Sequence, residues 1–362
     1  MMRPPLRHVL CTLVVVAVVL GELTLAAPAA LATPYPPAST NPLSLNPAPP
    51  VSDPLVGATW FVYHSDDAQR QMRYWERTGH PEWAALVAKI ADEPQTAHFG
   101  SFTANVGRDV RAYLHLVHHG TVPIIATYDL PHLGCTHRSD TPAQSRAFRG
   151  WIHAFAGAID RHHAVVFLEE DALITIGCLS RSGLAVRMSE LAYATRLLGR
   201  LPHAVTYVDA GAADGDPSPH RIAHLLRLAG IRYIRGFFLN ATHFDWTSKE
   251  LAYGNRVAGI LHTHFVVSTS ANGRGPLHPR HRRKNGNEVL CNPPGRGLGP
   301  VPTTDTGDPL ADAFMWIGID GRSDGQCHPG DPPNGKWFPA YALELARNAN
   351  GQLGPGYPSE PY

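Results

Sequence analysis

The chain has 362 residues, of which 44% are hydrophobic and 17% charged, and its 31 lysines and arginines nearly balance its 30 aspartates and glutamates. This balance excludes a global electrostatic field that would select nucleic acid or an anionic surface as a partner. The part that remains after the N-terminal segments described next is roughly 300 residues long, which suits one large barrel domain as well as two ordinary domains.

The first 32 residues predict a secretory signal peptide. Arg3 and Arg7 precede an apolar run from Val9 to Leu20, and a small-residue stretch ends at Ala32, where we expect cleavage. The run is about a dozen residues long, whereas a membrane span needs roughly 20. We therefore expect a secreted protein with no membrane span after cleavage; an uncleaved N-terminal anchor is the alternative.

Residues 33–54 are mostly Pro, Ser, Asn, Ala and Leu, with almost no charge and no periodicity. Such a segment buries too little apolar surface to order itself, so it predicts a flexible leader. Residues 55–362 remain as one folded domain, since no internal repeat or second linker divides them.

Short apolar runs in this domain alternate with longer segments that have helical spacing. The runs predict buried strands at 122–127, 164–168, 204–208, 233–239, 264–267 and 313–317. The longer segments predict helices at 144–159, 181–201, 220–229, 248–261 and 338–348. This alternation is typical of an α/β fold with parallel strands and crossover helices.

Polar residues follow each predicted strand, at the carboxyl ends where barrels of this kind carry their chemistry. They are Tyr128-Asp129, Glu169 to Asp171, Asp209, Asn240, Ser268 to Ser270 and Asp320 to Asp324. Aspartates after strands also cap the next helix, which is the simpler interpretation for any one of them. The whole set favours a site in which carboxylates converge on one rim.

Asp171 is the best candidate for a general acid. It follows the most apolar predicted strand and has Glu169 and Glu170 as like-charged neighbours, and both conditions favour the protonated form. A glycosidic oxygen needs a proton donor as it leaves, while a second carboxylate, Asp324 or Asp209, would assist a water molecule on the other face.

The predicted signal peptide contains Cys11, which leaves Cys135, Cys178, Cys291 and Cys327 in the mature chain. Four cysteines in an oxidising compartment indicate two disulfides, and three pairings are open. A zinc site is the alternative, but neither C-x-x-C nor H-E-x-x-H spacing occurs. We expect neither a metal nor another cofactor.

Several motifs of the domain occur together in one known family. They are Tyr128 to Pro131 with Cys135, Leu168 to Leu173, Tyr207 to Gly211, Gly236 to Asn240, His264 to Val267, Cys291 to Arg296, Asp312 to Trp316, Ser323 to Gly325 and Trp337 to Pro339. In these motifs and their order the chain resembles glycoside hydrolase family 6, the secreted β-1,4-glucanases and cellobiohydrolases that invert configuration.

The resemblance implies an incompletely closed seven-stranded (β/α) barrel with the disulfides Cys135–Cys178 and Cys291–Cys327. It implies that Asp171 is the proton donor and that Asp209 and Asp324 are further active-site aspartates, the latter acting as base or orienting a chain of water molecules. Tyr128 stands where an aromatic hydroxyl presses on a distorted sugar, and Ser139 loosely matches a serine that holds the attacking water. The expected substrate contacts are Tyr128, Ser139, Asn240, His243, Leu290, Gly318 and Arg322.

The chain also departs from the family pattern, and the departures cluster in the expected groove. They are Gly134 for an aspartate, Glu170 for a proline, His98 and Leu290 for tryptophans, Ala212 for a histidine, Gly215 for a tryptophan, His243 for an asparagine, Ser268 for an aspartate, Gly318 for a lysine and Arg322 for a glutamate. Loss of aromatic platforms weakens the binding of an extended glucan, and Gly134 removes a carboxylate that supports protonation of the acid.

Three functions follow from this pattern. The first is an inverting hydrolase of β-1,4-linked glucan or a related polysaccharide, which we expect to be a monomer. The second is a hydrolase-like protein that binds a glycan with little or no turnover. The third is an enzyme for an acidic or branched glycan, recognised by Arg322, His98, His243 and the basic stretch 278–284, although that stretch is also typical of a solvated loop.

Overall fold

The computed structural model describes residues 52–64, 66–133, 140–215, 218–277, 290–318 and 320–354. The predicted signal peptide and most of the predicted leader lie outside these ranges, as do Gly134, Cys135, Ser139 and the basic stretch. The chain from Ser52 onward forms one compact unit. None of its described helices has the length and apolar character that crossing a membrane requires.

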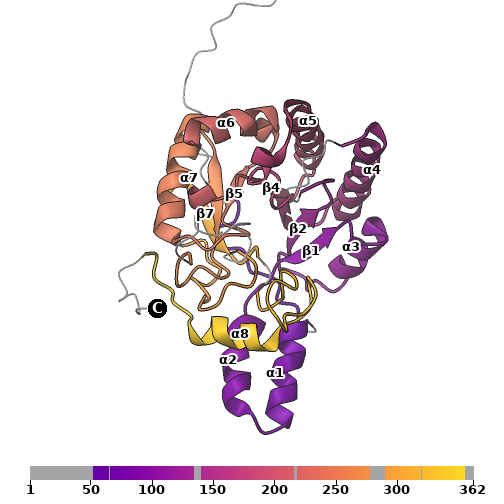
Figure 1. Ribbon diagram of the computed structural model, residues 1–362. Helices are drawn as coiled ribbons and strands as arrows, with labels where there is room; N and C mark the ends of the chain where they lie inside the picture. The colour runs from indigo at the N-terminus through magenta and orange to yellow at the C-terminus, as the bar shows by residue number, and fades with distance from the viewer. Residues whose placement is uncertain are drawn as a thin grey trace, which may run out of the picture. The chain divides into compact units, whose positions relative to one another are not determined.

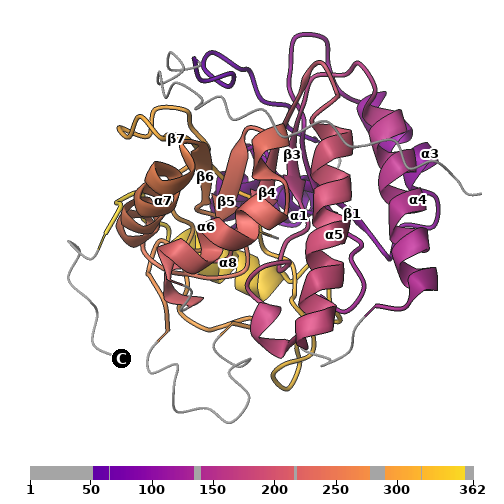
Figure 2. The ribbon, with the colours of Figure 1, turned by 90° about the horizontal axis from the view of Figure 1, so that it is seen from above.

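Seven parallel strands form one sheet in chain order, and the sheet curls into a barrel (Figures 1 and 2). The strands are β1 (Ala97–Gly100), β2 (Ile124–Tyr128), β3 (Ala164–Leu168), β4 (Ala204–Asp209), β5 (Gly236–Leu239), β6 (His264–Ser268) and β7 (Ala311–Met315). In the described sheet, β1 and β7 are edges that do not pair with each other. The Thr96 hydroxyl donates a hydrogen bond of 2.7 Å to the Trp316 carbonyl and thereby bridges this gap. The prediction of an incompletely closed seven-stranded barrel is confirmed.

Two groups of helices surround the sheet. Along its outer side lie α3 (Val106–Leu114), α4 (Pro142–Ile159), α5 (Arg181–Leu198), α6 (Pro219–Leu228) and α7 (Thr247–Leu261) (Figure 2). A separate layer contains α1 (Asp67–Arg77), α2 (Pro81–Ala91) and α8 (Pro339–Arg347) (Figure 1). Short 3₁₀ turns occur at η1 (Ile176–Cys178), η2 (Ala213–Gly215) and η3 (Ile231–Tyr233).

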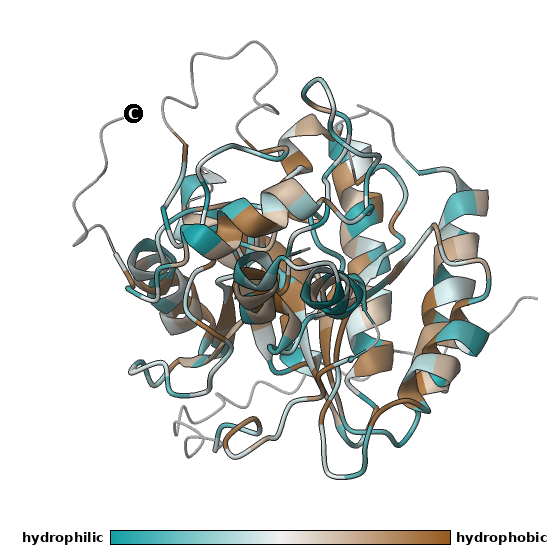
Figure 3. Ribbon diagram, turned by 90° about the horizontal axis from the view of Figure 1, so that it is seen from below, coloured by the Kyte–Doolittle hydropathy of each residue, from teal (hydrophilic) through white to brown (hydrophobic). Residues whose placement is uncertain are grey.

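The strand residues alternate between two apolar cores. In β3, Val165 and Phe167 point into the barrel, whereas Val166 and Leu168 pack against the outer helices, and all four are 0% exposed. Each such side chain stabilises the fold by roughly 1.5–3 kcal/mol through burial. Figure 3 shows the same arrangement, with hydrophobic strands inside and hydrophilic helix faces outside. Leu55 belongs to the inner core, so the compact unit includes the start of the predicted domain.

The predicted strands and helices after residue 122 are all present, with shifted ends. The predicted strand at 313–317 is two residues too late, and the one at 233–239 begins with the turn η3. The strand β1 and the helices α1, α2 and α3 were missed. The capping at Asp66 and Asn105 was the available signal for α1 and α3, since each side chain accepts a hydrogen bond from the first turn.

The predicted disulfide between Cys291 and Cys327 is present, with Cα atoms 6.1 Å apart. Cys178 is a disulfide cysteine as well, while Cys135, its expected partner, lies outside the described residues. The observed bond joins the segment before Asn292 to the loop after β7, and so fixes the surroundings of Asp324.

Candidate active site

The carboxyl group of Asp171 lies at the carboxyl end of β3, between two hydroxyl groups. The hydroxyl of Tyr128, at the end of β2, donates a hydrogen bond of 3.0 Å to Asp171 Oδ2. The Thr242 hydroxyl donates one of 2.8 Å to Asp171 Oδ1. The backbone of Asp171 has a φ of 68°, which is uncommon for a residue with a side chain. The Thr175 hydroxyl donates to the Asp171 carbonyl and so helps hold this conformation. The structure thus fixes both the backbone and the carboxyl group of the predicted acid.

Asp209 ends β4 and is 2% exposed. Its carboxylate accepts hydrogen bonds from the backbone N–H groups of Leu173 and Gly211, at 2.7 and 3.1 Å. The pKa of Asp209 is raised to about 7, mainly by burial and also by the nearby charges of Asp171 and Glu170, although the two backbone hydrogen bonds lower it. Asp209 therefore lies near Asp171, as predicted, and also anchors the loop after β3.

Asp324 belongs to the loop after β7 and is solvent-exposed as a residue. Its backbone N–H donates to the Asn292 side chain at 2.8 Å. Surrounding protein atoms desolvate the carboxyl group and raise its pKa to about 6, with added contributions from the charges of Asp171 and Glu170. Part of the Asp324 residue is still in contact with water, so a water molecule can reach it. The three predicted aspartates thus influence one another at one end of the barrel.

A buried ion pair between His98 and Glu170 stands beside these aspartates. His98 Nε2 lies 3.0 Å from Glu170 Oε1, and the two side chains are 15% and 6% exposed. Burial lowers the pKa of His98, but the charge and hydrogen bond of Glu170 outweigh it, so the pKa is raised overall. Both residues were recognised as departures from the family, but their pairing was missed because 72 residues separate them.

Glu169 has a different role. Its Oε2 accepts the backbone N–H groups of Asp129 and Leu130 at 2.9 and 2.8 Å, and its own N–H donates to the Thr127 hydroxyl. The side chain is 0% exposed, and burial raises its pKa. Glu169 therefore fastens the loop after β2 to the end of β3, which keeps Tyr128 next to Asp171.

Two of the expected substrate contacts bond within the protein. The Asn240 side chain is 2% exposed and bonds to the backbone of Asp245 and Ser268. It holds the loop after β5, and a direct contact between Asn240 and substrate stays a prediction. His243 Nδ1 lies 2.6 Å from Asp214 Oδ1, so this imidazole is already paired.

The other expected contacts lie on the β7 side or outside the described ranges. Arg322 forms an ion pair with Asp67 of α1 at 3.2 Å. The Gly318 N–H donates to the Ser270 hydroxyl at 3.0 Å, and a β-carbon on Gly318 would lie 2.8 Å from a backbone oxygen, so this backbone leaves little room for the expected lysine. Leu290 is half-buried, and Ser139 lies outside the described residues.

The loop after β1 carries an aromatic residue that the sequence interpretation missed. Phe102 is 67% exposed. A β-carbon built on Gly100 would lie 2.9 Å from Phe102 Cε1 and 2.8 Å from the Tyr128 carbonyl carbon. The Phe102 ring therefore lies beside the end of β2, where Tyr128 meets Asp171. An exposed aromatic ring in this place can stack on a sugar face.

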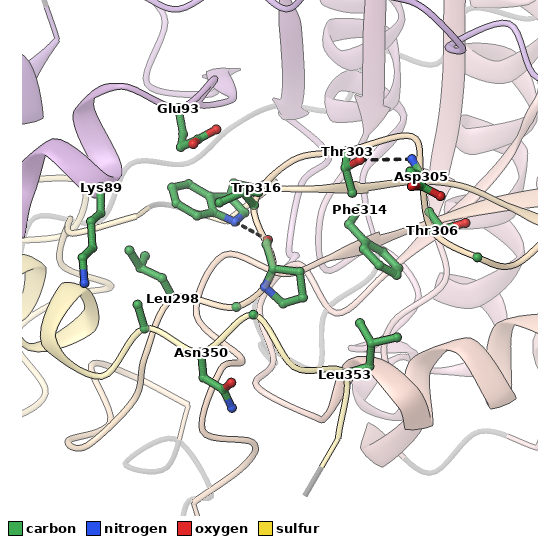
Figure 4. Close-up of a pocket in the computed structure, with 16 residues that line it drawn as sticks. Lys89, Glu93, Leu298, Thr303, Asp305, Thr306, Phe314, Trp316, Asn350 and Leu353 are labelled. Atoms are coloured by element: carbon green, nitrogen blue, oxygen red, sulfur yellow. Dashed lines mark hydrogen bonds between the residues drawn. The ribbon is translucent and has the colours of Figure 1, made fainter. Parts of the chain in front are cut away.

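A pocket of about 700 Å³ lies elsewhere, on the outer side of β7 (Figure 4). Its lining includes Phe314 and Trp316, with Lys89 and Glu93 from the α2 region. The Trp316 indole donates to the Pro300 carbonyl and is 1% exposed, so its ring is not offered to a ligand. No aspartate of the predicted catalytic set is among the described residues that line this pocket. We therefore place the chemistry at the barrel rim.

One cluster of acidic residues has the spacing of a metal site. Ligand oxygens of Asp214, Asp245 and Glu250 lie within 4.8 Å of one another. Each carboxylate already has a protein partner, which is His243 for Asp214, Lys249 for Asp245 and the Ala213 N–H for Glu250. We assign no metal to this cluster.

Comparison with known proteins identifies the family. Residues 56–349 match the glycosyl hydrolases of family 6. This chain belongs to that family. The endoglucanase Cel6 from Mycobacterium tuberculosis, solved with a methyl-cellobiosyl-4-deoxy-4-thio-β-D-cellobioside, is 33% identical, with a TM-score of 0.72 over 82% of this chain and 99% of that one. The predictions of family 6 and of a glycosidase are confirmed.

Relatives of this family 6 hydrolase include endoglucanases and probable 1,4-β-D-glucan cellobiohydrolases. Endoglucanase 1 of Streptomyces halstedii is 31% identical over 84% of this chain and 94% of its own length. Endoglucanase A of Cellulomonas fimi is 32% identical over 79% of this chain. The chain spans 61% of the length of that second relative.

Proposed function

We propose that this family 6 hydrolase is a secreted enzyme that hydrolyses β-1,4-linked glucan, or a related polysaccharide, with inversion of configuration. The observation that carries the proposal is the placement of the Asp171 carboxyl group between the hydroxyls of Tyr128 and Thr242, next to Asp209 and Asp324. The glucanase names of its relatives support the substrate class.

The proposed mechanism uses Asp171 as general acid. Asp171 gives its proton to the glycosidic oxygen as the bond from that oxygen to the anomeric carbon breaks. A water molecule attacks the anomeric carbon from the opposite face, and a second carboxylate takes its proton. Asp209 and Asp324 are the sequence-based candidates for this second role. Two hydroxyl groups beside Asp171 limit its rotation, which favours a productive orientation.

The proposal is tested with the mature protein, Asp171→Asn and Asp160→Asn, the last being an exposed aspartate at the end of α4. We expect Asp171→Asn to lower kcat on soluble β-1,4-glucan by about 10²–10⁴-fold, as for loss of a general acid. The loss should be smaller on an aryl glycoside with a good leaving group, and NMR of fresh product should show the α-anomer. Equal reducing-sugar release by wild type and Asp171→Asn would rule out this mechanism.

One observation favours the second candidate, a glycan-binding protein with little turnover. His98 stands where a tryptophan platform is expected, and its ring nitrogens are used by Glu170 and the Thr96 carbonyl. If the wild type binds glucans on a glycan array without releasing reducing sugar, this second function holds. The third candidate, an acidic glycan, gains less support, since Arg322 and His98 are both already paired with carboxylates.

A further inference from the structure

Glu170 occupies a central position on the rim. Its charge raises the pKa of Asp209, of Asp324 and of the Tyr128 hydroxyl, after the larger contribution of burial in each case. It also directly precedes Asp171 in the chain. Glu170 is therefore near every group of the proposed mechanism, although the sequence interpretation used it only as a like-charged neighbour of Asp171 and as a replacement for a proline.

The hydrogen bonds around His98 define where the protons lie. His98 Nδ1 is 3.0 Å from the Thr96 carbonyl, which can only accept, so Nδ1 carries a hydrogen. His98 Nε2 is 3.0 Å from Glu170 Oε1, so one proton lies between the imidazole and the carboxylate. This pair therefore holds Glu170 in one orientation and supplies a positive charge beside it.

The other oxygen of Glu170 is available. Oε2 has no hydrogen-bond partner among the described residues, and the side chain keeps 6% exposure. By contrast, both oxygens of Asp209 accept backbone N–H groups. Glu170 thus combines a side chain held in one orientation with a free oxygen that can reach a water molecule, as a general base requires.

We propose that Glu170 is a further catalytic carboxylate of this site, which takes the proton of the attacking water through Oε2 while His98 positions it through Oε1. This inference rests on the proposed function. The water oxygen forms a bond to the anomeric carbon and gives one proton to Glu170, while the bond to the leaving oxygen breaks and Asp171 supplies the proton of that oxygen. Glu170 thus gains one proton and Asp171 loses one, so the total number of protons on the two carboxyl groups is unchanged.

Other charged groups also face this pair. Arg322 lies close enough to His98 to lower its pKa, and Arg322 is itself paired with Asp67 of α1. On the opposite side Glu170 faces Asp171, Asp209 and Asp324. His98 is the cation that bonds directly to Glu170 among the described residues. Its removal would leave Glu170 beside Asp171, Asp209 and Asp324 without this hydrogen-bonded positive charge.

The first test replaces Glu170 in the complete mature chain. Glu170→Gln should lower kcat at least about 100-fold with little change in KM, as expected for loss of a general base. In Glu170→Gly, azide should restore turnover of an aryl β-glucoside by attacking the anomeric carbon from the face of the water, which yields an α-glycosyl azide. Asp171→Asn should form no such azide product.

The second test replaces His98 by asparagine, which donates a hydrogen bond but carries no charge, with the exposed His153→Asn of α4 as the matched control. Without the charge-assisted hydrogen bond, Glu170 is held less firmly toward the attacking water, so kcat should fall with little change in KM. His153→Asn should leave kcat unchanged. A purely structural role of His98 would lower the melting temperature but leave kcat per folded molecule near the wild-type value.

Three results would overturn the inference. They are a Glu170→Gln variant with the wild-type kcat, a folded Glu170→Gly variant that forms no glycosyl azide, and a folded His98→Asn variant with the wild-type kcat. Circular dichroism and melting temperature establish that each variant is folded. If Asp171→Asn is inactive while the Glu170 variants keep wild-type rates, the proposed function stands and only the role of Glu170 fails.

Discussion

The two ends of the barrel surround their buried carboxylates with different partners. At the amino ends of the strands, Asp312 accepts hydrogen bonds from Tyr207 at 2.6 Å and from two nitrogens of Arg235 at 2.8 Å, and His264 Nδ1 lies 3.1 Å away. The negative charge of the buried Asp312 carboxylate is thus balanced by several hydrogen-bond donors. At the carboxyl ends, several carboxylates lie close together, and the ion pairs described there join Glu170 to His98 and Asp214 to His243, while Asp209 accepts backbone N–H groups.

This difference separates stability from chemistry. A buried carboxylate that is fully hydrogen-bonded to a guanidinium holds its charge and fixes the strands around it. Buried carboxylates that lie close together have raised pKa values and can exchange protons near neutral pH. The ion pair at the amino end of this barrel therefore supports stability, while the carboxyl end is where the proposed mechanism has its chemistry, as is general for strand-and-helix barrels.

The largest effect on stability should come from Asp312→Ala. The change breaks the ion pair with Arg235, whose side chain is 11% exposed, and breaking a buried pair in this way destabilises a protein by about 3–5 kcal/mol. Chemical denaturation should show this loss, while kcat per folded molecule stays near the wild-type value. The control is Asp109→Ala, which removes a surface ion pair with Arg108 and should leave the free energy of unfolding nearly unchanged.

A smaller effect concerns pH and Asp209. Its pKa is about 7 in the folded chain and near 3.8 in the unfolded chain, so folding favours the protonated form. The resulting stability is fully present below pH 3.8 and is lost as the pH rises through about 7. The melting temperature of Asp209→Asn relative to wild type should therefore increase with pH between these values. A constant difference would show that Asp209 does not titrate in this window.

The smallest effect should come from Phe102→Ala, which tests binding at the carboxyl end. If the Phe102 ring stacks on a sugar, its loss should weaken binding by about 1 kcal/mol and raise KM several-fold with little change in kcat. The exposed Tyr74 of α1, 53% exposed, provides the control Tyr74→Ala, with unchanged KM expected. An equal KM in wild type and Phe102→Ala would exclude the ring as a platform.

The sequence predicted the parts of this molecule that depend on local patterns. Strands such as 164–168 are continuous apolar runs, and Asp171 and Asp209 follow them directly, so both were found. The strand β1 has only four residues with mixed burial, too few for a periodic signal. The His98–Glu170 pair and the contact of Thr242 with Asp171 join distant segments, and a single sequence carries no signal for such contacts.

The layer of α1, α2 and α8 has a consequence for the order in which the chain matures. Val87 and Ile90 of α2 are 0% exposed in a cluster that includes Leu345 of α8, and Thr96 bonds to Trp316. Segments from the beginning and the end of the domain therefore pack against each other, and such long-range contacts slow folding. During synthesis from the amino end, the face of α2 that packs against α8 stays exposed to solvent until residues 339–347 have been synthesised. Deletion of α8 would leave that apolar face exposed in the finished chain.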